Sequence, residues 1–284
     1  MNPSQPTPVH RQRVLVTGAA GRIAALILPA LRERYDPTLV DVLDTDAAGA
    51  AAPGVEVLDL LDDAGNRFVE LCREVDTIVH LGYARPGNAP TYAEERRNVD
   101  LADVVYSTAQ ATGVSRVVST STNQASKWYE RLYKQGRLDR VGPWDYPRPD
   151  NFYGWAKVAY ESLGFLYATG AVGPAVPNVQ IRIVAPRPIK AAAFADRPLA
   201  DYLRDITGWI SERDLQQLYV RSIEAASIDD EHGVPFQIFY GVSNNARTFW
   251  SITNAGEVIG YAPVDDSEVE FAAEIAQMLT RDAE

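Results

Sequence analysis

The sequence predicts an α/β protein in which a doubly wound parallel sheet is followed by a small C-terminal lobe. Three observations support this fold class. Short apolar runs alternate with helical stretches over the first two-thirds of the 284 residues, and repeated units of this length form parallel sheets with helices on both faces. A glycine-rich turn follows the first apolar run, and a run of hydroxyl side chains follows the fifth. In such a sheet both positions lie at the carboxyl ends of strands.

Each expected strand is a short run rich in Val, Ile and Leu. The strands are expected at residues 13–17, 38–42, 55–59, 77–81, 116–120 and 179–184. Helices are expected between them, at residues 22–34, 64–73, 94–112 and 152–168. Pro29 lies inside the first helix, where a proline removes a backbone hydrogen bond, so a kink is expected there.

The alternation stops at two places. Residues 127–150 are rich in Tyr, Trp, Arg and Pro, which is too irregular for core structure. Because long loops within compact domains are usually functional, this segment is expected to form a lid over a binding site. After residue 186 the expected elements are a helix at 214–226, a strand at 236–241 and a helix at 251–260.

The expected domain organisation follows from this change of pattern. Residues 13–186 should form the sheet domain, preceded by a disordered tail at residues 1–12, which are polar and hold three prolines. Residues 187–284 should form a lobe without an independent core, packed across the carboxyl ends of the strands. Since ligands bind at that edge of a doubly wound sheet, the lobe is expected to bind substrate.

Composition excludes several classes of function. A formal charge of −11 argues against a nucleic acid or an anionic membrane as partner, because both require a basic surface. The single cysteine, Cys72, excludes an intrachain disulfide and indicates a reducing compartment, the cytoplasm. No apolar run reaches the ~18 residues of a membrane helix, and the N-terminal segment lacks the apolar stretch of a signal peptide. The histidines are scattered, so no metal site is expected.

The turn after the first strand has the spacing of a dinucleotide-binding motif. Gly18, Gly21 and Ala24 hold its three small positions, which let the backbone approach a pyrophosphate at the helix N-terminus. The other members of the turn are Ala20, Arg22 and Ile23. An apolar strand precedes the motif and an apolar helix follows it, as in a Rossmann-type fold. The alternative is a tight strand–helix turn without a ligand.

A carboxylate at the end of the second strand strengthens this prediction. Asp41 follows the glycines by about 20 residues, where an acid accepts hydrogen bonds from the adenosine ribose and repels a 2′-phosphate. No arginine directly follows it, so NAD is favoured over NADP. Asp59 and Leu60 end the third strand, where an acid can meet the adenine amino group. The alternative for both acids is a solvated strand end.

The segment after the fourth strand is expected to pass the nicotinamide ribose. It consists of Leu81, Gly82 and Tyr83. His80, just before it, is expected to be a hydrogen-bonded core residue rather than a ligand.

Tyr153 and Lys157 are the candidate proton-transfer pair. Four residues apart, they share one face of the helix expected at 152–168. Of the 14 tyrosines, only Tyr153 has a lysine at this spacing. A free tyrosine, with a pKa of about 10, is a poor base at neutral pH. A nearby ammonium and oxidised nicotinamide are expected to lower that pKa. The alternative is a chance pair on a helix surface.

The fifth strand ends in a run of hydroxyl side chains, from Ser119 to Thr122. One of these hydroxyls is expected to polarise the reacting oxygen while Tyr153 takes its proton. The alternative is a polar strand end satisfied by neighbouring backbone.

These motifs together resemble the extended short-chain dehydrogenase/reductase superfamily, specifically its NAD-dependent epimerase/dehydratase family. The resemblance covers nearly the whole chain after the tail. Within the family, the later segments are similar to uronate dehydrogenases and related sugar dehydrogenases. Those segments are residues 121–124, 147–149, 209–214, 240–245 and 260–265. They are more specific than the glycine turn, which many unrelated activities share.

The resemblance implies roles for individual residues. Thr122 takes the place of the catalytic Ser/Thr, beside Tyr153 and Lys157. Asn98 and Ser121 fall at cofactor-binding positions. The implied substrate-binding residues are Arg85, Thr122, Asn123, Gln124, Tyr153 and Arg204. Arg204 falls where an arginine holds the carboxylate of a sugar acid, which a guanidinium fork suits geometrically. The alternative for Arg204 is a surface residue of the lobe.

Three departures from the family pattern affect positions that face the substrate. Gln124 replaces a histidine, residues 83–85 replace a segment of small residues with a serine, and Val184–Ala185 replace Gly-Ser. The segment between Thr122 and Tyr153 is also longer than usual. The reaction type is therefore expected to be retained, while the identity of the sugar stays open.

The leading hypothesis is an NAD-dependent oxidoreductase that converts the C1 hydroxyl of a sugar or sugar acid to the lactone. One alternative is a sugar epimerase or dehydratase that binds NAD tightly and recycles it. Another is a redox sensor or scaffold that binds NAD without catalysis. A homodimer is expected, because relatives pair through the helices expected at 94–112 and 152–168.

Overall fold

The computed structural model describes residues 12–46, 48–87 and 90–282. The tail predicted at residues 1–12 therefore lies outside the described residues, except for Gln12. The side-chain amide of Gln12 donates to Thr77 Oγ1 at 2.8 Å.

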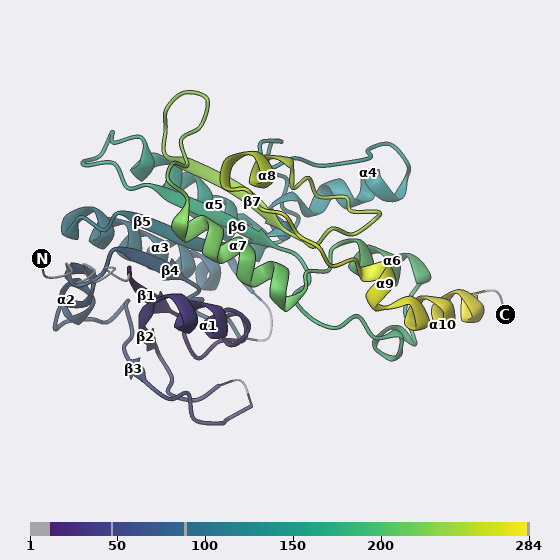
Figure 1. Cartoon of the computed structure of the whole chain (residues 1–284), viewed down its shortest axis with the longest axis horizontal. Coiled ribbons are helices and arrows are strands. Elements are labelled where there is room, and N and C mark those ends of the chain that lie inside the picture. Colours follow the sequence, from purple (N-terminus) through teal and green to yellow (C-terminus); the bar gives the residue numbers. More distant parts are fainter. Residues whose placement is uncertain (1–11, 47, 88–89, 283–284) are drawn as a thin grey trace, which may run out of the picture.

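The centre of the molecule is one sheet of seven parallel strands in the order β3-β2-β1-β4-β5-β6-β7 (Figure 1). The strands are β1 (Arg13–Thr17), β2 (Asp36–Asp41), β3 (Val55–Val57), β4 (Thr77–His80), β5 (Arg116–Thr122), β6 (Asn178–Ile183) and β7 (Phe236–Gly241). The order runs outward in opposite directions from the β1–β4 pair, which is the switch point of a doubly wound sheet. The predicted Rossmann-type α/β fold is confirmed.

Helices cover both faces of the sheet, and alternate strand residues face opposite layers. Val14 and Val16 pack with one layer, formed by α1 (Arg22–Arg34), α7 (Glu212–Glu224) and α8 (Thr253–Ile259). Leu15 packs with the other layer, formed by α2 (Arg67–Arg73), α3 (Tyr92–Thr112) and α5 (Phe152–Ala168). The helix α1 continues through Pro29, and α1 and α5 have the predicted bounds.

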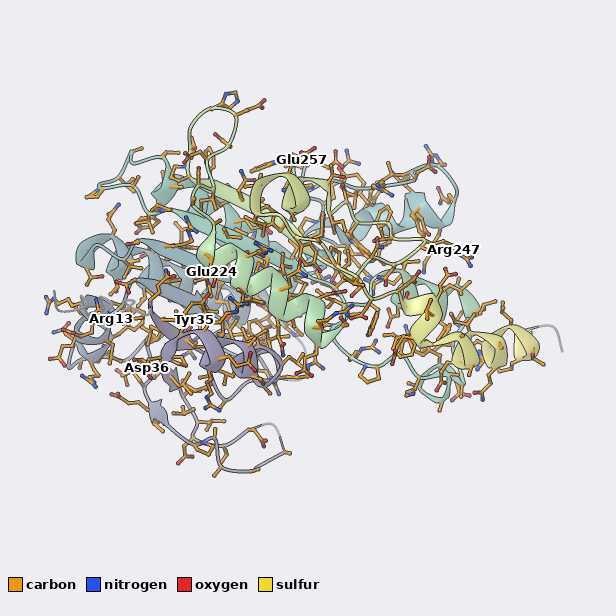
Figure 2. All side chains as sticks on the ribbon, in the orientation of Figure 1. Arg13, Tyr35, Asp36, Glu224, Arg247 and Glu257 are labelled. Atoms are coloured by element: carbon orange, nitrogen blue, oxygen red, sulfur yellow. The ribbon has the colours of Figure 1, made fainter. Side chains whose placement is uncertain are left out.

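The division predicted at residue 186 differs from the observed layers. β7, which was assigned to the lobe, pairs in parallel with β6 and completes the sheet. α7 completes one helical layer. Tyr35, just after α1, donates to Glu224 at the end of α7 at 3.1 Å (Figure 2). The sequence assigned these elements to the lobe because the alternating pattern stops before them.

The remaining C-terminal elements lie beyond the carboxyl ends of the strands. They are η2 (Ala191–Phe194), α6 (Leu199–Thr207), α9 (Ser267–Glu270) and α10 (Ala272–Asp282). Contrary to prediction, this part has an apolar cluster of its own, which includes Phe194, Tyr202, Ile206, Phe271 and Met278. The cluster joins two segments that are far apart in sequence, so neither segment alone reveals it.

The expected irregular loop is more ordered than predicted. The chain forms η1 (Asn123–Tyr129) and α4 (Glu130–Lys134). Val141 is fully buried in a cluster with Phe249 and Trp250, and its N–H donates to the carbonyl of Phe249 at 2.9 Å. The statement that this segment is too irregular for core structure is therefore wrong at Val141, while its role as a lid stays a prediction.

Within residues 12–46, 48–87 and 90–282, no helix is both long and apolar enough to cross a membrane.

Two loops meet closely at the switch point. Gly18 has a φ of +71°, and a Cβ on it would lie 2.7 Å from the backbone nitrogen of Gly82. Backbone atoms cannot move aside as a flexible side chain does, so the position requires glycine.

We expect Gly18→Ala to lower the free energy of unfolding by roughly 2–4 kcal/mol, because it combines a left-handed backbone with a backbone clash. Gly49→Ala is the matched control. Gly49 also has a positive φ, of +81°, but a Cβ there meets none of the described atoms within 4 Å. Its cost should be roughly 1 kcal/mol. Chemical denaturation measures both, and equal losses would show that the close approach to Gly82 is unimportant.

Candidate active site

Asp41 joins the end of β2 to the glycine turn. Its Oδ2 accepts the N–H of Ala20 at 2.9 Å, and its Oδ1 accepts the N–H of Leu43 at 3.3 Å. The carboxylate is therefore fixed beside the turn, at the position predicted for the adenosine ribose. Its contact with the ribose stays a prediction.

The N-terminus of α1 suits an anionic group. In this fully described helix, Gly21 gives no side-chain cap and the first turn holds no acidic residue. Arg22 instead occupies the first position and is exposed. A cation there is unfavourable beside the positive end of the helix dipole, unless an anion binds between them. These residues fit the pyrophosphate of a dinucleotide, with Ile23 partly buried behind them.

Asp59 and Leu60 have local structural roles. Asp59 is exposed, and its Oδ1 accepts the N–H of Leu61 at 2.9 Å. Leu60 is buried in the core beneath α2. An adenine contact from Asp59 stays a prediction.

Asn98 fixes the segment that follows β4. Its Oδ1 accepts the N–H of Ala84 at 2.7 Å, and its Nδ2 donates to the carbonyl of Ala84 at 3.1 Å. The Asn98 side chain is fully buried, so it orders the predicted nicotinamide segment from behind. Leu81 is anchored in the same segment, because its N–H donates to the carbonyl of Thr17 at 3.0 Å.

The three predicted catalytic residues converge at the carboxyl end of β5. Tyr153 and Thr122 share a side-chain hydrogen bond. The rings of Tyr153 and Tyr83 meet edge to face at 5.3 Å, and Lys157 Nζ lies 5.6 Å from the Tyr83 ring. Lys157 is buried, and its Nζ donates to the carbonyl of Thr120 at 2.9 Å. One helix and one strand end therefore present a phenol, a hydroxyl and an amine together.

Burial dominates the electrostatics of Tyr153 and Lys157. It raises the pKa of Tyr153 above its usual value, although the hydrogen bond from Thr122 and the charge of Arg22 act to lower it. The lowering of the Tyr153 pKa by the ammonium together with oxidised nicotinamide stays a prediction. Burial also lowers the pKa of Lys157 to about 7, against the opposing charges of Glu95 and Glu161. The influence of Arg22 indicates that the glycine turn lies near the catalytic tyrosine.

His80 is a core residue, as predicted. Its Nδ1 and the hydroxyl of Thr17 are 2.7 Å apart. Burial and the charge of Lys157 lower the pKa of His80 to about 3, so its imidazole is neutral at physiological pH.

Ser121 lies within a buried network that includes Glu161 of α5. Its hydroxyl donates to Glu161 at 2.7 Å. Glu161 also accepts both Nε and a terminal nitrogen of Arg182, each at 2.7 Å. The side chain of Ser121 is thus committed to Glu161, and this leaves its backbone for the predicted cofactor contact.

The predicted substrate residues lie on different elements. Asn123 follows Thr122 directly and is buried, while Gln124 Oε1 accepts the side-chain amide of Asn151 at 2.8 Å. Arg85 is exposed after β4. Arg204 of α6 is largely buried and ion-paired with Glu130 at 2.5 Å and with Asp205 at 2.8 Å. Arg204 is therefore not the surface residue of the alternative interpretation.

Sequence reasoning missed two buried carboxylates, Glu95 and Glu130. Glu95 is fully buried and accepts the hydroxyl of Tyr83 at 2.6 Å. Glu95 lies seven residues before Ala102 on the buried face of α3. A charged residue at helical spacing within an apolar stripe was therefore the signal that could have predicted its burial. Glu130 follows an irregular segment, where no periodicity distinguishes a buried carboxylate from a solvated one.

Comparison with known proteins identifies the family. The sequence model of the NAD dependent epimerase/dehydratase family matches residues 14–188, which is more than half of the chain. The chain belongs to this family. It is an NAD-dependent oxidoreductase, so the resemblance and the cofactor predicted from the sequence are confirmed.

Members of the family with curated names are similar over most of their length. The NAD-dependent glucose-6-phosphate dehydrogenase of Haloferax volcanii is 31% identical, over 93% of this chain and 97% of the relative. The L-arabinose 1-dehydrogenase (NAD(P)(+)) of the same organism is 28% identical, over 90% of this chain and 97% of the relative. A structure of a mutated uronate dehydrogenase is 28% identical, with a TM-score of 0.73 over 94% of this chain and 86% of that chain.

The depressed pKa of Lys157 predicts a pH-dependent effect of its removal. Below about pH 7 the folded protein holds a buried ammonium, which burial penalises in full. Between about pH 7 and pH 10.5 only the unfolded chain binds this proton, so the penalty disappears as the pH rises. Relative to the unsubstituted protein, Lys157→Met should therefore gain roughly 3–5 kcal/mol more stability at about pH 6 than at about pH 10.

Denaturation at the two pH values tests this expectation, with Lys190→Met as the control. Lys190 is 61% exposed, so its removal should show no such dependence. A Lys157→Met effect that does not change with pH would contradict the depressed pKa.

Proposed function

We propose that this protein oxidises the C1 hydroxyl of a sugar to a lactone, with NAD as the hydride acceptor. The observation that carries the proposal is the geometry at the end of β5, where the Tyr153 ring meets Tyr83 at 5.3 Å and the buried Lys157 Nζ donates to Thr120 at 2.9 Å and lies 5.6 Å from the Tyr83 ring. The relatives support the substrate class, since they include a glucose-6-phosphate dehydrogenase and an L-arabinose 1-dehydrogenase, the latter specific for position 1 by its name.

In this mechanism Tyr153 is the general base. Its phenolate oxygen takes the proton of the sugar hydroxyl, while Thr122 donates a hydrogen bond to the reacting oxygen and orients it. NAD, when bound, would supply the hydride acceptor and a positive nicotinamide ring. The Gly18–Ile23 turn and Asp41 would hold its pyrophosphate and adenosine, and Lys157 would hold the nicotinamide ribose.

The raised pKa of Tyr153 is consistent with this order of events. Burial alone keeps the phenol neutral, so proton removal is favoured only when further positive charge enters the site. Lys157, with a pKa of about 7, would supply that charge when its ammonium form donates hydrogen bonds to a ribose hydroxyl and is stabilised by the charge of Glu95. Burial therefore keeps Tyr153 protonated until the cofactor is bound.

Tyr153→Phe should lower kcat by roughly 10²–10⁴-fold, because it removes the general base and keeps the ring. Tyr35→Phe is the matched control, because it removes a hydroxyl that donates to Glu224 outside the predicted site, and it should leave kcat unchanged. The assay follows net NADH formation with aldoses, uronates and phosphorylated sugars, and net formation also separates a dehydrogenase from an epimerase that recycles NAD. If none of these sugars reduces NAD, the proposed function is wrong.

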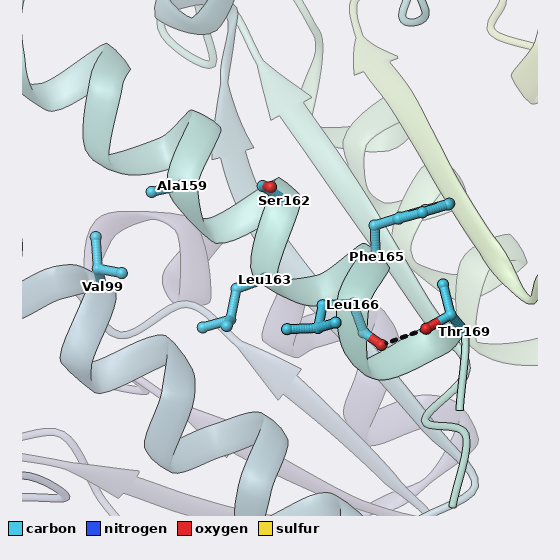
Figure 3. A pocket seen from close by; sticks show the side chains of 7 residues that line it. All are labelled: Val99, Ala159, Ser162, Leu163, Phe165, Leu166 and Thr169. Carbon is cyan, nitrogen blue, oxygen red and sulfur yellow. Dashed lines mark hydrogen bonds between the residues drawn. The ribbon is translucent and has the colours of Figure 1, made fainter. Parts of the chain in front are cut away.

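We also propose that α3 and α5 form the surface of a homodimer. A groove of about 500 Å³ on these helices lies away from Tyr153 and is lined mainly by apolar side chains, including Val99, Leu163, Phe165 and Leu166 (Figure 3). Phe165 and Leu166 are each 41% exposed. Two helices that already pack together, with adjacent exposed apolar residues, favour a second helix pair as the occupant.

Leu166→Glu should convert the dimer to a monomer at micromolar concentration, because it would bury a charge at the interface. Light scattering after gel filtration measures the mass. Val269→Glu, at a 78% exposed valine on α9, should leave the mass unchanged. A monomeric unsubstituted protein, or a dimeric Leu166→Glu variant, would refute this interface.

A further inference from the structure

The buried carboxylate of Glu130 lies between the catalytic strand end and Arg204. Its Oε1 accepts a terminal nitrogen of Arg204 at 2.5 Å and the side-chain amide of Asn123 at 3.5 Å. Its Oε2 accepts Lys127 Nζ at 2.7 Å. The side chain is only 8% exposed. Such a carboxylate is stable in the interior because three polar partners surround it.

Both terminal nitrogens of the Arg204 guanidinium already donate to carboxylates of the protein. One terminal nitrogen donates to Glu130, and the other donates to Asp205 at 2.8 Å. Its Nε is buried, without a partner among the described groups, so a ligand cannot reach that edge. One face of the guanidinium lies over the ring of Trp250, at 5.3 Å. The two terminal nitrogens that would bind a ligand carboxylate are therefore each already paired with a carboxylate of the protein.

The same cluster is connected to the catalytic centre. Thr122, which hydrogen-bonds Tyr153, lies 3.5 Å from Asn123 Oδ1 through its hydroxyl. Asn123 in turn contacts Glu130. Glu130 is thus linked to Thr122 through one intervening side chain, which is a suitable position for contacting the distal part of a small substrate held at Tyr153.

The buried centre of the cluster carries one net negative charge, because Arg204 is paired there with two carboxylates. Glu130 and Asp205 offset Arg204 there, and each is 8% exposed. Lys127 and Arg187 pair with the outer sides of these carboxylates and are 29% and 39% exposed. The one excess positive charge therefore lies toward the surface rather than on Arg204.

We propose that the site around Glu130 and Arg204 selects an uncharged, hydroxyl-rich sugar. Glu130 supplies from within the chain the carboxylate that Arg204 would otherwise bind in a sugar acid. The inference rests on the proposed function and specifies its substrate class. A uronate would bring a third carboxylate beside Glu130 and Asp205, which like-charge repulsion opposes. A neutral sugar would donate its hydroxyls to the remaining lone pair of Glu130 Oε2 and bring no charge.

The test compares matched sugar pairs with the unsubstituted enzyme. Galactose and galacturonate form one pair, and glucose and glucuronate the other, with glucose 6-phosphate as a further anion. The neutral member of each pair should have a kcat/KM at least about tenfold higher. Equal or better oxidation of a uronate or of the phosphorylated sugar would overturn the inference and leave the proposed function intact.

Glu130→Gln tests the residue itself. The neutral amide keeps the shape of the side chain but removes its negative charge, so kcat/KM for the uronate should rise. The ratio of kcat/KM for the neutral sugar to kcat/KM for the uronate should therefore fall by about tenfold or more. Asp201→Asn is the matched control. Asp201 lies on α6 one turn before Arg204, and its described ion pairs are with Lys134 and Arg197. Its substitution should leave the ratio unchanged, and an unchanged ratio in Glu130→Gln would refute the proposal.

Binding to the NAD-loaded, unsubstituted protein gives an answer that depends neither on turnover nor on folding of the variant. Calorimetry should detect galactose binding that is at least about tenfold tighter than galacturonate binding. Tighter binding of galacturonate would overturn the inference even if no NADH forms. Absence of turnover with intact preference for the neutral sugar would instead reject only the proposed function.

Discussion

The close approach of two backbones at the switch point is the constraint on which the site depends. Gly18 lies against the Leu81–Gly82 backbone at a distance that a side chain would not permit. This contact sets the turn after β1 beside the segment after β4. Asp41 then holds the turn, and Asn98 holds the segment. The positions of Tyr83, Tyr153 and Lys157 follow, because α5 packs against the same edge.

Around this contact the protein buries charged groups in pairs. Glu161 and Arg182 form a bidentate pair, and Glu130 and Arg204 form a second buried ion pair. Burial of an unpaired charge is costly, so each pair restricts how its elements move. The arrangement favours one rigid geometry over adaptability, which suits transfer of a proton and a hydride within a single complex.

The sequence predicted what depends on short segments. The glycine spacing, the Tyr153–Lys157 interval and the bounds of α1 and α5 are local, and each was recognised from a few letters. Contacts between distant segments were not. β7 pairs with β6 although 52 residues lie between the end of β6 and the start of β7. Val141 is buried because Phe249 and Trp250 pack against it. Arg204 shows the limit for the site, since its family position was identified but its two carboxylate partners were not.

The late position of β7 and α7 affects how this chain emerges from a ribosome. Until residue 224 has been made, the apolar face over β1, β4 and β5 lacks α7, and until residue 241 has been made, the edge of β6 lacks its neighbour. The nascent chain therefore still exposes an apolar surface and an unpaired strand edge after the nucleotide motif and the tyrosine–lysine pair have been made. The segments with the cofactor and catalytic motifs can therefore complete their sheet and helical layer only after α7 and β7 have been synthesised.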